Sequence, residues 1–135
     1  MDMNDKTLKS LTTALNFREM RQELISSNVA NANTPGYKAK KLDFEEALAR
    51  ALDVDGQMQM NTTDGRHHNV GNGGFNNLEP EIYDNPNGVV SEDGNTVDVE
   101  AEMAQMAENK LMYDALVQLI NKKMGIMKYA INSEK

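Results

Sequence analysis

Two adjacent histidines, His67 and His68, are the residues whose type first suggests chemistry, because imidazole nitrogens bind zinc and other transition metals. Neighbouring residues of a helix or strand point in different directions, so an adjacent pair rarely holds one ion. Asp64 lies nearby, but the chain has no Cys and no H-E-x-x-H spacing. We expect no metal site here and interpret the pair as solvated loop residues, with a metal hydrolase kept as an alternative to test.

Other catalytic patterns are also weak. The glycine-rich stretch 71–74 is not followed by Lys and Ser or Thr, and no strand is expected before it, so it does not resemble a phosphate-binding loop. The acidic residues are scattered over polar chain, and none forms an expected acid–base pair in an apolar pocket. The sequence therefore predicts a protein that is not an enzyme and that uses no cofactor.

The overall charge of −7, from 21 acidic and 14 basic residues, argues against nucleic-acid binding, which needs an excess of Lys and Arg. No run of 18 apolar residues is present, so no direct membrane insertion is expected. The first residues lack the basic segment and apolar stretch of a secretory signal. We expect either a cytoplasmic protein or export without a cleaved signal peptide.

Charge and composition divide the 135 residues into three segments. Residues 1–52 and 95–135 are nearly neutral, whereas residues 53–94 carry all the net negative charge, seven of the nine glycines and few apolar side chains. Such a segment has little apolar area to offset its ordering entropy, so we expect a flexible or irregular middle. Turn residues at 84–88 predict a short hairpin between 81–83 and 88–91.

The C-terminal segment is predicted to be one long helix, because apolar residues recur in alternating steps of four and three, as in a coiled coil. Asp98 is the expected N-cap, and Lys110 interrupts the series. The predicted C-terminal seam comprises Val99, Met103, Met106, Tyr113, Val117, Ile120, Met124, Met127 and Ile131. A second apolar line runs through Ala107, Leu111, Ala115, Leu116 and Leu119.

The N-terminal segment predicts a helix from about residue 7 to 31, with an apolar stripe that weakens around Arg18 and Gln22. Pro35 and Gly36 follow its end, and a third, short helix is expected from Asp43, as its cap, to Leu52. The expected fold is mainly α: long N- and C-terminal helices pair as a coiled coil and form one helical domain around the irregular middle.

More apolar surface is expected than one helix pair buries, which favours packing into a larger assembly. The alternative is a monomeric helical hairpin whose two stripes face each other. Periodicity alone leaves both open.

Residues 27–38 favour the larger assembly over the monomeric hairpin. In this stretch, a helix end rich in Asn and Ala is followed by a tight turn. Asn amides carry donors and an acceptor, so they can join backbone groups of two chains. The stretch resembles the N-terminal signature of bacterial flagellar rod, hook and hook-junction proteins. The matching residues, which we interpret as an assembly motif, are Asn28, Ala30, Asn31, Asn33, Thr34, Pro35, Gly36 and Tyr37.

The second half of the chain supports this resemblance. Residues 93–103, with Asn109 and Tyr113, are similar to the family's C-terminal signature. Residues 62–68 and the small size of the chain point to the proximal-rod branch of the family. Another axial protein of the rod or hook junction, and an intracellular helical adaptor, are the alternatives.

The resemblance implies a structural subunit of a hollow helical shaft that transmits torque from motor to hook and is required for motility. It implies a location in the basal-body rod, outside the cytoplasmic membrane. The implied partners are copies of the chain, other rod proteins, the membrane-supramembrane ring, the rod-base adaptor and the flagellar export apparatus. Phe44 and Leu48 resemble an export-gate recognition element, although an ordinary amphipathic turn explains them equally well.

Replacing both His67 and His68 with Ala should leave the metal content of the purified protein unchanged, because we expect neither to be a ligand. Elemental analysis after extensive dialysis measures this. Stoichiometric zinc that disappears with the two side chains would establish the metal site instead.

Overall fold

The computed structural model describes residues 6–54 and 78–133, which form three helices and two strands. The elements in chain order are α1 (Lys6–Ala30), β1 (Lys40–Asp43), α2 (Glu45–Val54), β2 (Glu81–Asp84) and α3 (Val99–Ser133). The histidine pair and the resemblance at 62–68 lie outside the described residues. The predicted fold class is confirmed: long terminal helices, with a small antiparallel sheet between them.

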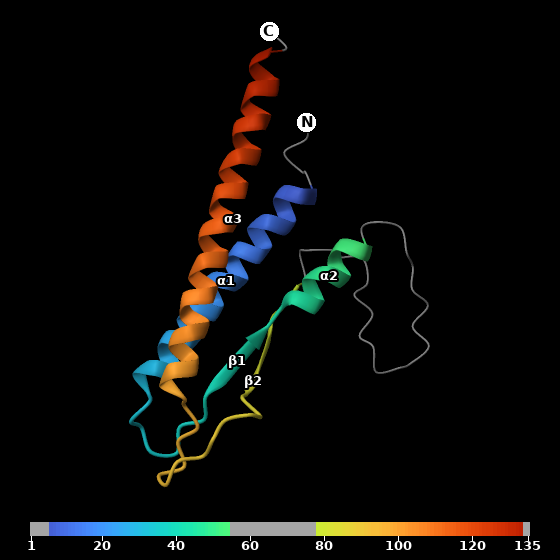
Figure 1. Cartoon of the computed structure of the whole chain (residues 1–135). Coiled ribbons are helices and arrows are strands. Elements are labelled where there is room, and N and C mark those ends of the chain that lie inside the picture. Colours follow the sequence, from blue (N-terminus) through green and yellow to red (C-terminus); the bar gives the residue numbers. More distant parts are fainter. Residues whose placement is uncertain (1–5, 55–77, 134–135) are drawn as a thin grey trace.

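The helices α1 and α3 lie side by side and antiparallel, and α3 extends beyond the first described turn of α1 (Figure 1). The predicted cap of α3 is confirmed, since the Asp98 carboxylate accepts a hydrogen bond from the backbone N–H of Ala101 at 3.2 Å. With 35 residues, α3 is about 50 Å long at ~1.5 Å per residue. Both long helices thus form where periodicity predicts them.

The buried side of α3 differs from the predicted seam at five of its nine positions. Buried and half-buried residues recur along α3 in steps of four and three, as a heptad requires. They are Glu102, Met106, Asn109, Tyr113, Leu116, Ile120, Lys123, Met127 and Ala130. The predicted seam shares four of these residues, but polar side chains stand at three of the alternate positions, and an apolar pattern cannot reveal them.

The other five residues of the predicted seam point away from α1 or lie at the edge of the interface between α1 and α3. Val117 is half-buried, whereas four others are exposed: Val99, Met103, Met124 and Ile131. Most of the second apolar line is exposed as well, with Leu111 at 70% and Leu119 at 51% of their full accessibility. The helix pair therefore leaves much of the apolar surface of α3 uncovered.

The predicted strand at 81–83 is present, but its partner is β1 and not residues 88–91. Lys40 pairs with Asp84 and Asp43 with Glu81 in the antiparallel register. The turn between 84 and 88 is confirmed by the backbone hydrogen bond from Gly88 to Asn85 at 3.3 Å. This turn leads away from the sheet, because residues 91–96 then dock against the end of α1.

The expected cap of the short helix is wrong, because Asp43 ends β1 and does not begin α2. Its carboxylate instead accepts a hydrogen bond from the Tyr83 hydroxyl at 2.5 Å. The N-terminal turn of α2 is closed by Glu45, whose carboxylate accepts from the backbone N–H of Phe44 at 3.2 Å. A long-range partner on β2 thus displaces the local capping role of Asp43.

The small apolar core lies where α1, β1 and the start of α2 meet. Phe17, Leu42 and Phe44 are each at most 5% exposed, and the two rings lie 5.2 Å apart between centroids. Three partly buried leucines complete it: Leu24, Leu48 and Leu78. This cluster attaches the sheet and α2 to the middle of α1.

Gly88→Ala should destabilise the fold by about 1–3 kcal/mol, because the added Cβ would lie 2.8 Å from the Cβ of Thr96. Gly125→Ala is the matched control, since nothing lies within 4 Å of a Cβ at that position of α3. There, Ala should stabilise the helix by about 0.5–1 kcal/mol. Urea unfolding of both variants measures the difference, and equal midpoints would contradict the close approach.

Candidate assembly site

Asn28, the first Asn of the predicted assembly motif, is fully buried near the end of α1 and binds the first residue of β1. Its amide nitrogen donates to the carbonyl oxygen of Lys40 at 2.8 Å, and its amide oxygen accepts from the Lys40 N–H at 3.0 Å. The same oxygen accepts from the Tyr37 hydroxyl at 3.1 Å. One side chain therefore satisfies both backbone groups on the edge of β1 that faces away from β2.

Asn95, in the C-terminal signature, is a second buried amide that binds backbone groups. It is 3% exposed, and its amide nitrogen donates to the carbonyl oxygens of Asn31 at 2.9 Å and Thr34 at 2.8 Å. Its amide oxygen accepts from the backbone N–H of Val97 at 2.8 Å. The turn that follows α1 is thus held by a residue just before α3.

The two connecting segments touch along their backbones. Gly36, with φ of 73°, donates its N–H to the carbonyl of Asp93 at 2.9 Å. Gly94, with φ of 81°, lies in van der Waals contact with Gly36, since a Cβ on Gly94 would stand 3.5 Å from the Cα of Gly36. The left-handed backbone favours glycine at both positions. The N- and C-terminal signatures therefore meet as one structure, which we call the corner (residues 28–40 and 91–97).

The corner changes how the motif amides are interpreted. Asn28 and Asn31 are bonded within the chain, since the Asn31 side chain donates to the carbonyl of Ser27 at 2.8 Å and accepts from the Thr34 hydroxyl at 3.1 Å. The expectation that such amides join two chains is therefore not needed for these two. The part of the motif left exposed comprises Ala30, Asn33, Thr34, Pro35 and Gly36.

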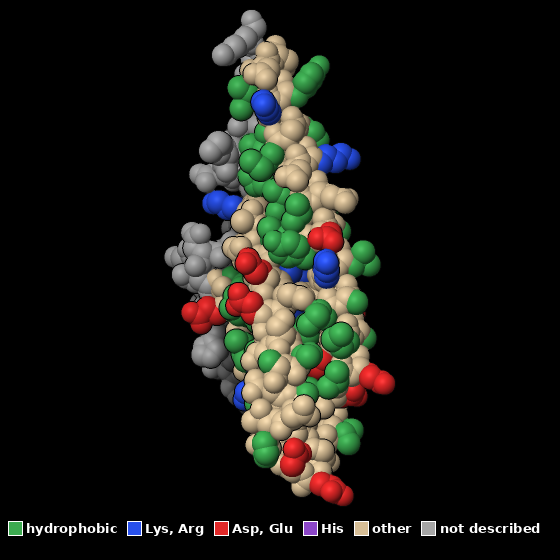
Figure 2. All heavy atoms as spheres, turned by 90° about the vertical axis from the view of Figure 1, so that its left-hand side faces the viewer, with side chains coloured by type: hydrophobic (Ala, Val, Ile, Leu, Met, Phe, Trp, Pro, Cys, Tyr) green, Lys and Arg blue, Asp and Glu red, His purple; other side chains and the backbone are tan. Residues whose placement is uncertain are grey.

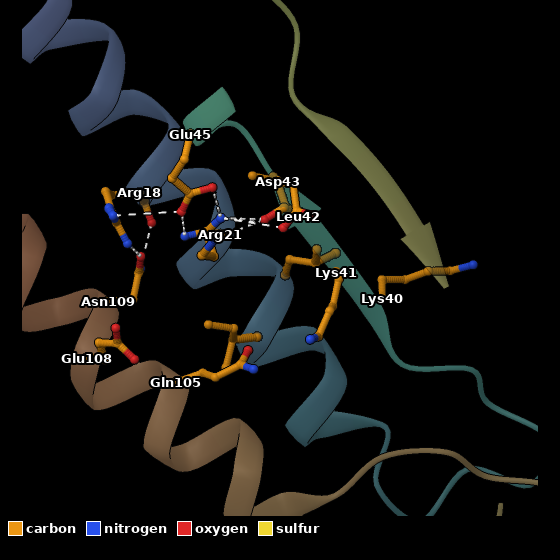
Figure 3. A pocket seen from close by; sticks show the side chains of 12 residues that line it. Arg18, Arg21, Lys40, Lys41, Leu42, Asp43, Glu45, Gln105, Glu108 and Asn109 are labelled. Carbon is orange, nitrogen blue, oxygen red and sulfur yellow. Dashed lines mark hydrogen bonds and ion pairs between the residues drawn. The ribbon is translucent and has the colours of Figure 1, made fainter. Parts of the chain in front are cut away.

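A second polar cluster joins α1 to β1 and α2 through Arg21 (Figure 3). Its guanidinium donates to the carbonyl of Leu42 at 2.6 and 3.0 Å and to both oxygens of the Glu45 carboxylate at 2.6 and 3.0 Å. The guanidinium carbon also lies 4.6 Å from the centroid of the Phe44 ring. The planar guanidinium thus holds a carboxylate, a carbonyl and an aromatic face together.

Asn109 extends this cluster to α3. It is 2% exposed, and its amide nitrogen donates to the carbonyl of Arg18 at 2.8 Å and to the side-chain oxygen of Gln22 at 3.1 Å. Its amide oxygen accepts from the Arg18 guanidinium at 3.4 Å. A buried polar residue at a heptad position sets the register between helices, so Asn109 fixes how α3 lies along α1.

The electrostatics of this cluster favour an ionised Glu45. Partial burial raises the pKa of its carboxyl, but hydrogen bonds from Arg21 and the local backbone outweigh that effect and lower the pKa to about 2. For Arg18, burial and the charge of Arg21 lower the pKa, while Glu45 and Glu108 raise it. The net effect lowers the pKa of Arg18, and the Glu45 carboxylate stays ionised between two guanidinium groups.

A cleft of about 280 Å³ lies beside this cluster, between α1, α3 and β1 (Figure 3). Its lining includes both cations and carboxylates, among them Lys41 on β1 and Glu108 on α3. Among residues 6–54 and 78–133, no group of three or more His, Cys, Asp or Glu side chains could hold a metal ion.

The exposed face of α3 is apolar along much of its length. Figure 2 shows hydrophobic side chains gathered along this side of the molecule, with a few charged ones between them. The large exposed apolar residues of α3 are Val99, Met103, Leu111, Met112, Leu119, Met124, Ile126, Tyr129 and Ile131. We call these residues the open face.

Pattern analysis missed the polar residues that join the elements: Arg18, Arg21 and Glu102. One signal was present, because the apolar stripe of α1 weakens at Arg18 and Gln22, where Asn109 inserts from α3. The proposed export residues lie in the core, with Phe44 3% exposed and Leu48 packed against the cluster.

Comparisons with known proteins agree with this arrangement. Residues 8–38 match the family described as "Flagella basal body rod protein". The chain is 40% identical over 121 residues to the flagellar basal body rod protein FlgB of Cereibacter sphaeroides (strain ATCC 17023), covering 90% of each chain. It is 31% identical to FlgB of Bacillus subtilis (strain 168) over the full length of both, and 35% identical to FlgB of Escherichia coli (strain K12) over 84% of this chain and 83% of the relative.

The chain belongs to the flagellar basal-body rod proteins, a family of structural proteins and not of known enzymes. Within that family it is a structural subunit of the proximal rod in the flagellar basal body. In the part of the chain that the structure describes, no helix is long and apolar enough to cross a membrane.

Asn28→Ala should destabilise the isolated protein by about 2–4 kcal/mol, because it empties a buried site and leaves both backbone groups of Lys40 unpaired. Asn33→Ala is the matched control, since this neighbouring amide is exposed and its loss should change stability by less than about 0.5 kcal/mol. Urea unfolding measures both, and equal effects would contradict the buried role of Asn28.

Acid should weaken the fold through Glu45, whose pKa falls from 4.5 to about 2 on folding. A lowered folded pKa gives stability that is complete above the unfolded value and is lost as pH falls toward the folded value. Glu45→Gln should therefore remove part of the loss of stability between these two pH values. Glu46→Gln, at an exposed carboxylate that pairs with Arg50 at 3.5 Å, should keep the wild-type profile. Identical profiles for all three proteins would refute the role of Glu45.

Proposed function

We propose that the subunit acts as one building block of a hollow helical drive shaft that carries torque from the flagellar motor to the hook. The observation that carries this proposal is the open face of α3, which leaves nine large apolar side chains exposed on a helix whose other side is already packed. Apolar surface of this extent on a long helix favours burial by neighbouring molecules.

The corner supplies the stiffness that such a role needs. Its hydrogen bonds hold α1, β1 and the start of α3 at one end of the helix pair, and Asn109 holds the pair at its middle. Force applied at α3 would therefore reach β1 and α2 without first separating the helices. A mechanical subunit needs this coupling and needs no catalytic centre.

The partners follow from the family. We propose contacts with copies of the same chain and other rod proteins, and at the base of the rod with the membrane-supramembrane ring and its adaptor. Repeated contacts between different faces of identical subunits produce a helical tube when they do not close into a ring. The exposed part of the motif, around Asn33 and Pro35, is the surface of the corner that a neighbour can reach.

The location that we propose is outside the cytoplasmic membrane, after passage through the flagellar export apparatus without a cleaved signal peptide. Phe44 and Leu48 are then recognised before the chain folds, because Phe44 is 3% exposed and Leu48 packs against the same core once β1 and α2 have formed. An export element inside the core is compatible only with transport of an unfolded chain.

Leu111→Asp should abolish swimming and rod assembly while leaving the isolated subunit folded, because this side chain is 70% exposed in the subunit and would be buried by a neighbour. Leu111→Met, which keeps an apolar side chain, is the control and should swim normally. Motility on soft agar, isolated basal bodies and circular dichroism of the purified subunit measure these effects. Normal swimming of the Asp variant would contradict burial of the open face.

A further inference from the structure

Glu102 is a buried acidic residue that the proposed shaft does not explain. It lies on the side of α3 that faces α1 and is 5% exposed. Its Oε2 is the single buried side-chain oxygen or nitrogen, among the described residues, without a hydrogen-bond partner. An ionised carboxylate in such a place is costly unless it is paired, so this oxygen requires either a proton or a cation.

Among the described residues, one cation, Lys41, acts on the carboxyl of Glu102. From α1 it faces the neutral amide of Asn28, on its own helix the nearest charge is Asp98, and from β1 the nearest is Lys41. Burial raises the pKa of Glu102 and the charge of Asp98 adds to this, whereas the Asn28 amide and the Lys41 charge lower it. The net result is a raised pKa, so Lys41 does not compensate fully where it lies.

Lys41 is the β1 residue whose charge reaches this carboxyl. It lines the cleft between α1, α3 and β1. In the view of Figure 3 it points away from the Arg21–Glu45 pair, toward the side of the cleft where Gln105 of α3 lies. Gln105 is three residues from Glu102 along α3, which is about one turn.

We propose that Glu102 and Lys41 form a proton-linked latch between α3 and β1. In acid the carboxyl is neutral and stays sealed beside Asn28, while Lys41 remains in the cleft. When the carboxyl loses its proton to solvent, the Lys41 charge offsets only part of the cost of the buried negative charge, so the contact of α3 with β1 beside Asn28 loosens. The latch acts on Asn28, so it regulates how firmly the corner is held, independently of whether a neighbour covers the open face.

The latch predicts a pH dependence opposite in sign to that of Glu45. A carboxyl with a raised folded pKa adds stability that is complete below its unfolded value, near 4.5, and that is lost as pH rises through the folded value. Glu102→Gln keeps the shape of the side chain and cannot ionise. Its urea midpoint should match that of the wild type in acid and exceed it at pH values above the folded pKa.

The decisive measurement is a carbon-13 NMR titration of the Glu102 carboxyl in the purified full chain at low concentration. Lys41→Met should raise its pKa by about half a unit or more, since the one nearby cation is lost. Lys40→Met is the matched control, because this adjacent lysine pairs with Asp84 on β2, and it should leave the Glu102 pKa unchanged.

Two outcomes would overturn the latch. One is a Glu102 carboxyl that titrates at or below 4.5; the other is a response to Lys41→Met no larger than the response to Lys40→Met. If Lys41→Met folds poorly, Lys41→Arg keeps the charge and should preserve the wild-type titration, and a raised pKa in that variant would also count against the latch. Because every measurement uses the unassembled chain, failure here leaves the shaft proposal intact, and loss of assembly leaves the latch intact.

Discussion

The buried amide of Asn28 is the contact on which the rest of the molecule depends. β1 has one edge paired with β2, and the other edge would be left with unpaired polar groups beside α1. Asn28 binds both backbone groups of Lys40 on that edge. Arg21 binds the carbonyl of Leu42, two residues further along the same strand. Two side chains of a helix thus take the place of a third strand, which holds the sheet against α1.

From this constraint the corner follows. A strand held at Lys40 places Ala39 where its N–H donates to the hydroxyl of Thr96 at 2.8 Å, and this brings the start of α3 beside the end of α1. Asn95 then binds the carbonyls of Asn31 and Thr34 in the turn that follows α1. Residues more than 60 positions apart are joined in this way, so neither terminal helix can be positioned without the other.

In the interface between the two long helices, the apolar and the polar residues have different roles. Met106, Tyr113 and Ile120 supply contact area, whereas Asn109 accepts only one position of α3 relative to Arg18 and Gln22. A helix pair built for strength alone would have an apolar residue there. One side of α3 is thus set in register, and the rest of its surface leaves large apolar side chains exposed.

Local spacing and short motifs were enough to predict both long helices, the cap at Asp98, the turn after residue 84 and the family. Tertiary structure decided the partner of β2, the role of Asp43 and which side of α3 meets α1. These depend on contacts between residues far apart, such as Asn28 with Lys40 and Asn109 with Arg18. The spacing of apolar residues cannot predict such pairs, because buried amides, guanidinium groups and carboxylates occupy positions that the pattern assigns to solvent.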